Sequence, residues 1–229
     1  MAFAGTLLRS LPILACLWPS ALWASEVKEV YSESFFCGCQ PGALEAGRAS
    51  CPFFPNVSFE GPSYNWLRLM PLDTAGAAGV CSGEMAPAEC DTAALEEALR
   101  IDLYNWLPVT ADVHQMLQGR TFIDIATELR PSSCDLELSD EVAAVEPPDH
   151  LKGDIARRML YLVGRYNISL PDQYLQMLIN WDANDPVSGT EYRISRKLGE
   201  LQKSDNAFVT VRYERAQKKM KAAIPEALR

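Results

Sequence analysis

Side chains that could transfer protons or bind a metal ion are concentrated between Asp102 and His114. This stretch also holds Asn105 and Asp112, and the whole chain has just two histidines. Oxygen and imidazole groups are common ligands of divalent metals, and histidine is the usual general base near neutral pH. If His114 and either aspartate face one cleft, a metal site can form there. The alternative, which we favour, is that His114 is a solvated helix or loop residue.

The second histidine, His150, ends the sequence EPPDH, which also contains Glu146 and Asp149. A surface position explains it more simply than a role as metal ligand. Asp154 follows four residues later, where a helix is expected to begin. An acid in the first turn interacts favourably with the helix dipole, so we interpret these acids as part of a helix start.

The cysteines indicate the redox environment. The chain has seven, and Cys16 lies in the N-terminal apolar segment. The others are Cys37, Cys39, Cys51, Cys81, Cys90 and Cys134. An even number in an exported protein favours disulfides. A zinc site is the alternative, but no CxxC pair is present. Cys81 and Cys90 would close a short loop and are the expected local pair, whereas the sequence leaves the other partners open.

Residues 1–24 are predicted to be a secretory signal peptide. Arg9 precedes an apolar run without acids, and small residues follow up to Ala24. A membrane anchor is disfavoured because prolines interrupt the run, which is too short to span a bilayer. A lipoprotein signal ending at Cys16 is a further alternative. We therefore expect residues 25–229 to form one exported domain, periplasmic or secreted, with no membrane span.

The net charge of the chain indicates which classes of partner it can bind. The chain carries 21 basic and 30 acidic residues, a net charge of −9, and loss of Arg9 with the signal would make it −10. Proteins that bind nucleic acid usually present an electropositive face. Nucleic acid is therefore a disfavoured partner, and any such binding should be weak and salt-sensitive. A basic patch would have to come from Arg157, Arg158, Arg165 and residues 218–221. An unknown periplasmic or extracellular partner is the alternative.

Apolar periodicity predicts mostly helical mass. One helix should begin at Asp91 or Thr92, bury leucines at 95, 99 and 103, and end at Pro108. Further helices are predicted over 153–166, 171–182 and 190–204, and the basic segment 212–229 is helix-prone but peripheral. In the first of these, Arg157, Arg158 and Arg165 should lie outside the apolar stripe. Residues 26–64 and 127–150 are rich in turn-forming residues.

Five segments of the chain are informative when they are considered together and in order. In order, they are FFCGCQ with the later SCPF, DLYNWLPVTADV, EPPDHLKGDIARRMLYLVGRY, WDANDPVSGTEYRI and LQKSDNAFV. Together they resemble the bacterial endonuclease I family of periplasmic and secreted, metal-dependent DNases. The resemblance covers nearly all of the mature chain. It implies an α+β, ββα-metal nuclease-like single domain, mostly helical with a small sheet and stabilised by disulfides.

The stretch YNWLRLMPL aligns with the family's Glu-Trp-Glu-His-Val-Val-Pro-Ala through Trp66 and Pro71. The resemblance then implies that Leu67 occupies the position of a metal-binding glutamate. Arg68 occupies that of the general-base histidine, and Gly79 replaces an arginine used near the scissile phosphate. Leucine offers no lone pair to Mg²⁺, and arginine keeps its proton and cannot act as a base. By the family's mechanism, all three positions should be inert.

The segment around Asn105 is better preserved, because this residue matches the family's other metal ligand. Tyr104 replaces a family histidine and, with Trp66, is expected to fill the volume around the former site. His114 stands where the family has the asparagine of a Glu-Val-Asn run. Residues that could substitute for the lost ligands are Asp102, Asp112 and His114.

Three functions remain. We favour a degenerate nuclease homologue that acts by binding and needs no cofactor, because loss of a general base alone typically slows a reaction about 10²–10⁴-fold. The alternative is an active Mg²⁺-dependent endonuclease that cleaves DNA or RNA phosphodiester bonds with a rearranged site. A disulfide-stabilised scaffold cannot be distinguished from the first by sequence.

Overall fold

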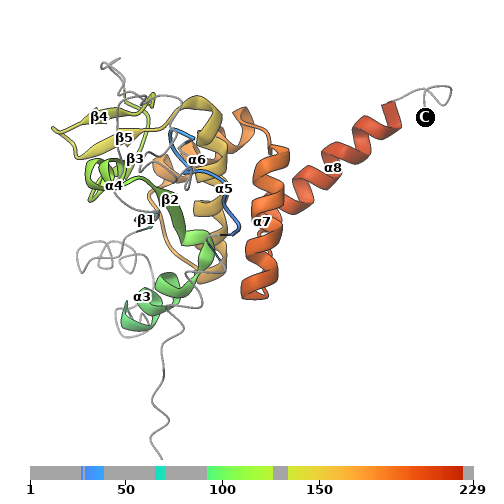
Figure 1. The fold of residues 1–229 in the computed structure, drawn as a ribbon, viewed down its shortest axis with the longest axis horizontal. Coiled ribbons are helices and arrows are strands. Elements are labelled where there is room, and N and C mark those ends of the chain that lie inside the picture. The colour runs from blue at the N-terminus through green and yellow to red at the C-terminus, as the bar shows by residue number, and fades with distance from the viewer. Residues whose placement is uncertain (1–26, 28, 39–64, 71–91, 126–133, 224–229) are drawn as a thin grey trace, which may run out of the picture.

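The computed structural model describes residues 27, 29–38, 65–70, 92–125 and 134–223. Its elements are β1 (Asn65–Arg68), α3 (Thr92–Ile101), the 3-10 turn η2 (Leu103–Asn105), β2 (Trp106–Val109), α4 (Ala111–Leu117), β3 (Thr121–Phe122), β4 (Glu137–Ser139), β5 (Ala144–Glu146), α5 (Asp149–Tyr166), α6 (Asp172–Asn184), α7 (Gly189–Gln202) and α8 (Ala207–Ala223). The short strands and α4 lie on one side of α5, and α7 and α8 lie on the other (Figure 1). The described part is thus mainly helical with little sheet, as predicted.

Two small sheets form the strand side. β1 and β2 pair antiparallel, with Leu67 opposite Leu107 and Arg68 opposite Trp106. The other sheet has the order β3-β5-β4, in which β5 runs parallel to β3 and antiparallel to β4. β4 and β5 lie in the stretch 127–150, which we predicted to be loop. Each has three residues, too few to produce a recognisable alternation of polar and apolar residues.

The first predicted helix is shorter than expected. α3 ends at Ile101, and Pro108 lies inside β2. The reason is Asp102, whose carboxylate accepts a hydrogen bond from the Tyr104 backbone amide at 2.9 Å. This cap starts the 3-10 turn instead of continuing the helix, and the chain leaves the turn extended. Leu99 and Leu103 are nevertheless buried, as predicted.

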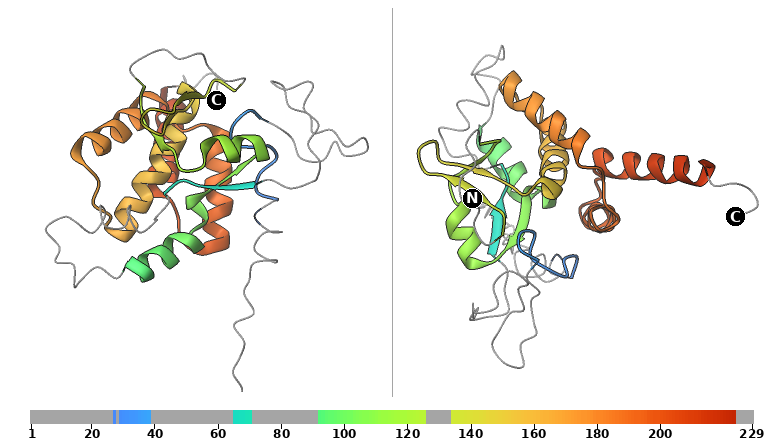
Figure 2. Two further views of the ribbon diagram at one scale, coloured as in Figure 1. Left: turned by 90° about the vertical axis from the view of Figure 1, so that its left-hand side faces the viewer. Right: turned by 90° about the horizontal axis from the view of Figure 1, so that it is seen from above.

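The predicted helices over 153–166, 171–182 and 190–204 are confirmed as α5, α6 and α7, with bounds that differ by a few residues. As far as residue 223, the basic C-terminal segment is part of α8, which projects from the body (Figures 1 and 2). None of the helices in the described ranges combines the length and apolar composition needed to cross a bilayer.

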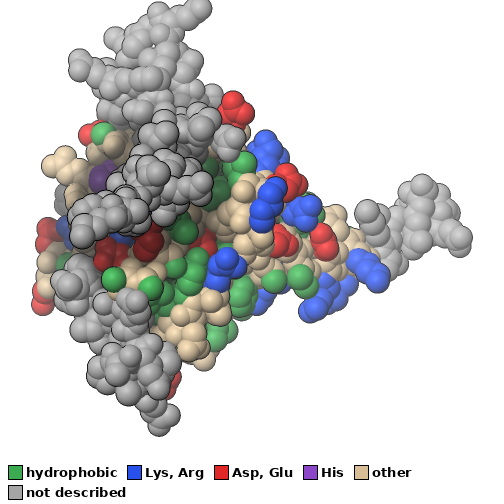
Figure 3. Space-filling model, turned by 90° about the horizontal axis from the view of Figure 1, so that it is seen from below, with side chains coloured by type: hydrophobic (Ala, Val, Ile, Leu, Met, Phe, Trp, Pro, Cys, Tyr) green, Lys and Arg blue, Asp and Glu red, His purple; other side chains and the backbone are tan. Residues whose placement is uncertain are grey.

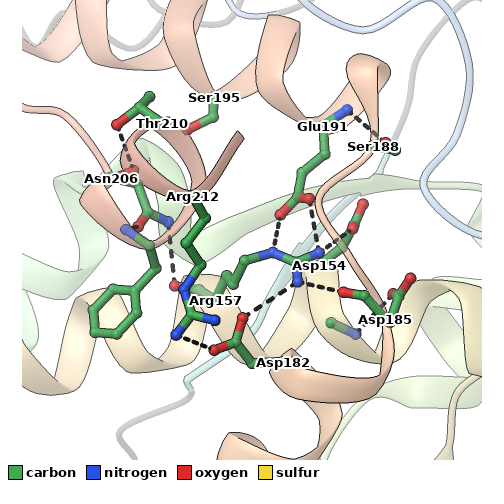
Figure 4. A network of polar contacts seen from close by, with 12 residues as sticks. Asp154, Arg157, Asp182, Asp185, Ser188, Glu191, Ser195, Asn206, Thr210 and Arg212 are labelled. Atoms are coloured by element: carbon green, nitrogen blue, oxygen red, sulfur yellow. Dashed lines mark hydrogen bonds and ion pairs between the residues drawn. The ribbon is translucent and has the colours of Figure 1, made fainter. Parts of the chain in front are cut away.

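α5 corrects the prediction for two of its arginines. Arg157 and Arg158 are buried, at 0% and 5% exposure, whereas Arg165 is exposed as expected. The helix packs against α6 on one side and α8 on another, so polar positions outside its apolar stripe also face protein. Arg157 compensates for its burial by donating to Glu191 at 2.6 and 2.7 Å (Figure 4).

The predicted position of Asp154 in the first turn of its helix is also wrong. α5 begins at Asp149, so Asp154 lies in the second turn and pairs with Arg157 at 2.9 Å. It therefore contacts a buried guanidinium, and it lies beyond the first turn where we expected it to interact with the helix dipole.

A disulfide joins Cys37 to Cys134, two residues that are 97 positions apart. It ties the N-terminal segment to the chain just before β4, and closing so long a loop removes much conformational freedom from the unfolded chain. The prediction of disulfides is confirmed for these two cysteines. The expected Cys81–Cys90 pair, Cys39 and Cys51 lie outside the described residues, as does the predicted signal peptide.

Candidate functional site

A pocket of about 220 Å³ opens where the antiparallel β1–β2 pair meets α4. β1 contributes three of its residues, β2 contributes Trp106, and α4 with the turn that follows it supplies most of the opposite wall. The described lining residues are Trp66, Leu67, Arg68, Trp106, His114, Leu117, Gln118, Gly119, Arg120 and Phe122. The pocket therefore contains both positions that the sequence comparison marked as altered.

Arg68 is held in place by a ring rather than by an acid. Cross-strand register places it opposite Trp106, and its guanidinium carbon lies 5.2 Å from the centroid of that ring. Within the described residues, no carboxylate forms an ion pair with it. A guanidinium over an indole face keeps its charge and its N–H donors available.

Leu67 serves the core. It is 6% exposed and belongs to the main hydrophobic cluster, opposite Leu107 at 0%. Side chains alternate along a strand, so Trp66 and Arg68 share the other face of β1. The position that the resemblance assigns to a metal-binding glutamate is thus an apolar contact at the edge of the pocket.

Asn105 is buried and bonded to backbone groups. Its Oδ1 accepts from the Met70 amide at 2.8 Å, and its Nδ2 donates to the Leu99 carbonyl at 2.9 Å. It is 0% exposed and does not line the pocket. In this chain Asn105 fastens the end of α3 to the segment after β1, which is a structural role.

Two further predicted residues also point elsewhere. Asp102 accepts hydrogen bonds from Tyr161 at 3.2 Å and Tyr166 at 2.7 Å and is 4% exposed. Tyr104 donates to the Ser195 carbonyl at 2.8 Å, and burial raises its pKa. Tyr104 has the core position that we expected, but it does not line the pocket, and its hydroxyl reaches α7. Trp66 does line the pocket, as expected.

The structure places the remaining candidates as follows. His114 is half-buried on α4 and lines the pocket. Asp112 is exposed on α4 and is not part of the lining. Glu146 binds Lys152 at 2.6 Å, and His150 is exposed, as predicted. Gly79 lies outside the described residues.

Sequence reasoning missed Trp106, Arg120 and Phe122 as pocket residues. Arg120 donates to the Met116 and Ser139 carbonyls at 2.9 and 2.8 Å and pairs with Asp140, so it is anchored at the rim. The signal that could have revealed Trp106 is its pairing with Arg68, which requires recognising β2 as a strand.

The described lining does not fit a divalent cation. It contains Arg68, Arg120 and His114 but no carboxylate, and Mg²⁺ requires oxygen ligands. Among the described residues, no group of three or more His, Cys, Asp or Glu side chains is placed to hold a metal ion. The pocket is instead cationic and aromatic, a combination suited to an anion.

Comparison with known proteins places this site in context. The model of the family described as Endonuclease I matches residues 25–212. An extracellular deoxyribonuclease of Aeromonas hydrophila is 25% identical over 91% of this chain and 96% of its own length. A periplasmic deoxyribonuclease of the same species is 23% identical over 78% of each chain. Endonuclease-1 of Buchnera aphidicola subsp. Acyrthosiphon pisum is 23% identical over 77% of this chain and 73% of its own.

The relatives' names agree with the export predicted from the sequence, and the protein is periplasmic or secreted. The family match extends over most of the chain, including β1, β2, α4 and all the residues that line the pocket. The chain belongs to the endonuclease I family.

Proposed function

We propose that this protein is a degenerate member of its family, one that binds through the β1–β2 pocket and has little or no metal-dependent phosphodiesterase activity. The observation that carries the proposal is the charge of the pocket. Its described lining has two arginines and a histidine and no acid. A pocket of this charge repels a divalent cation and attracts an anion.

The arrangement of β1, β2 and α4 supports a ββα-type ancestry for the site. β1 and β2 pair, α4 follows β2 after Thr110, and α4 packs against β1. The Thr110 hydroxyl accepts from the Val113 amide at 3.4 Å and so begins α4 at the position that aims His114 at the pocket. By the resemblance, such a scaffold would present a metal ligand and a base on β1, where this chain has Leu67 and Arg68.

A second candidate is an active endonuclease with a rearranged site. It is favoured by His114, the only described pocket residue whose side chain is of a type that commonly serves as a general base. If it acts as the base, activity should vanish in the His114→Gln variant.

A plasmid-nicking assay tests both. Purified mature protein is incubated with supercoiled plasmid in Mg²⁺ and in EDTA, beside the extracellular deoxyribonuclease of Aeromonas hydrophila as a positive control. We expect the relative to nick in Mg²⁺ and this protein to leave the plasmid supercoiled. Nicking that requires Mg²⁺ and is lost in His114→Gln would replace the binding proposal with the second candidate.

Isothermal titration with Mg²⁺ gives an independent readout. The cationic lining predicts no saturable heat in the millimolar range. A stoichiometric Mg²⁺ site of submillimolar affinity would show that acids outside the described residues complete a metal centre, and it would count against the proposal.

A further inference from the structure

Arg68 differs from the other buried or half-buried arginines of the described residues in having no oxygen acceptor. Four others are buried or half-buried, and each donates to an oxygen: Arg100, Arg120, Arg157 and Arg158. Arg68 is half-buried with a ring beneath it, and no oxygen in the described residues accepts from it. A guanidinium that is partly desolvated and lacks an acceptor is prepared to receive an anion, and its planar fork fits phosphate oxygens.

The groups around Arg68 define the kind of anion. His114 lines the same pocket, and its imidazole has no hydrogen-bond partner in the described part of the chain. Indole and phenyl groups from Trp66, Trp106 and Phe122 form apolar walls. Cations beside aromatic faces are the combination by which proteins hold the phosphates and unstacked bases of single strands.

We propose that the pocket binds a single-stranded nucleic acid without a metal ion. The Arg68 guanidinium receives a backbone phosphate in place of the divalent cation, His114 donates a second hydrogen bond to it, and a neighbouring base packs against the aromatic wall. The inference rests on the proposed function in one respect, namely that the ligand is held and not hydrolysed. It adds the ligand class and the residue that replaces the metal.

The size of the pocket favours a single strand over a duplex. About 220 Å³ accommodates a phosphate and part of one nucleotide, whereas a duplex keeps its bases stacked and away from an enclosed aromatic wall. The other basic surface is the projecting helix α8, where lysine and arginine side chains gather (Figure 3). Arg215, Lys218 and Lys219 there are exposed, so that surface would attract any polyanion irrespective of strandedness.

The test is fluorescence anisotropy with a labelled oligonucleotide of about 12 nucleotides, a length within the site size of known single-strand binders. It is run in EDTA over a salt series. We expect micromolar binding at low salt that persists in EDTA and exceeds binding of the matching duplex. Arg68→Gln should weaken it at least about tenfold, because a charge-assisted hydrogen bond is lost. The slope of log affinity against log salt should fall by about 0.7, the value for one phosphate contact on a single strand.

Two variants serve as controls. Arg193→Gln removes one exposed positive charge from α7 and should change affinity less than about twofold. Arg68→Lys keeps the charge but not the planar fork, and should lose affinity only in part; it also guards against misreading a folding defect in Arg68→Gln.

Three outcomes would overturn the inference: no binding by the parent protein, binding that requires Mg²⁺, or equal affinity of the parent and Arg68→Gln. Loss of binding in Arg215→Gln/Lys218→Gln/Lys219→Gln with Arg68→Gln unaffected would assign it to α8 instead. The proposed function fails separately, through nicking, so a protein that neither cuts nor binds single strands would contradict this inference alone.

Discussion

Two regions of the molecule have an arginine at their centre: the β1–β2 pocket, and the network of polar contacts that joins α5 to α6 and α7. The two arginines differ in whether the protein itself supplies partners for their N–H groups. Arg157 is 0% exposed and meets Glu191, Asp154, Asp182 and the carbonyl oxygen of Asp185 (Figure 4). Arg68 is half-buried over Trp106 and has no acceptor among the described residues. The N–H groups of Arg157 donate to oxygens of the protein, whereas those of Arg68 have no acceptor in the described residues.

The difference separates structural from ligand-binding cations. A buried charge is tolerated when its partners are built into the protein, and Arg157 has more acidic partners than its charge requires. Asp182 balances part of this excess by pairing with Arg212 on α8 at 2.5 Å. A cation left without an acceptor in a concave site gains most when a ligand supplies one. Removing the guanidinium should therefore cost much stability at Arg157 and little at Arg68.

The largest effect is expected at Arg157. Arg157→Gln leaves the buried carboxylates of Glu191 and Asp182 without their cation, and breaking a buried pair in this way typically costs about 3–5 kcal/mol. Urea denaturation followed by circular dichroism should show this loss. The matched control, Arg196→Gln, removes an exposed arginine 3.8 Å from Glu200 and should cost less than about 0.5 kcal/mol. A loss below about 1 kcal/mol at Arg157 would end the contrast between the two arginines.

The second effect concerns Asn105, which the sequence presented as a retained metal ligand. Asn105→Ala removes the partners of the buried Met70 amide and Leu99 carbonyl, and we expect it to lower the free energy of unfolding by about 2–3 kcal/mol. Asn180→Ala, at an exposed position on α6, is the control and should cost less than about 0.5 kcal/mol. If Asn105→Ala left stability unchanged but removed Mg²⁺ affinity, the assignment of a structural role would be wrong.

Asn105 and Arg157, compared with the two β1 positions, show what the sequence could and could not reveal. The family motifs located Leu67 and Arg68, and the structure places both at one pocket. The motif around Asn105 identified a residue type but not the direction of its side chain, which depends on the 3-10 turn started by Asp102. Periodicity found α5 but treated Arg157 as solvent-facing, because the acids that balance it lie up to 34 positions away in the chain. Contacts at such separations leave no local pattern.

The third prediction concerns how the free energy of unfolding changes with pH, which depends on Asp154. Burial and the nearby Glu191 carboxylate raise the pKa of Asp154 to about 8. An aspartate in the unfolded chain titrates near 4, so between about pH 4 and 8 the folded protein retains a proton that the unfolded chain has released. The free energy of unfolding should therefore fall as pH rises in this window, by up to about 1.4 kcal/mol per pH unit.

Asp154→Asn should remove that slope, as measured by urea denaturation at pH 5, 6.5 and 8. The control is Asp149→Asn, because its hydrogen bond to Lys152 lowers the pKa of Asp149. The contribution of Asp149 is lost only as pH falls below the ordinary range of an aspartate, so its variant should keep the parent slope. Equal slopes for the parent and Asp154→Asn would show that Arg157 holds Asp154 ionised throughout.

The smallest effect on stability is expected at Arg68. Arg68→Gln removes a partly exposed cation–π contact, worth about 0.5–1 kcal/mol, and breaks no described ion pair. Its consequence should appear only with ligand present. Saturating single-stranded oligonucleotide at about 100 times its dissociation constant should stabilise the parent by about 2.7 kcal/mol and raise its melting temperature, whereas the same concentration should shift Arg68→Gln far less. Arg193→Gln should respond as the parent does. If instead Arg68→Gln unfolded as readily as Arg157→Gln, its guanidinium would be bound within the protein, and the pocket would have no free cation to offer a phosphate.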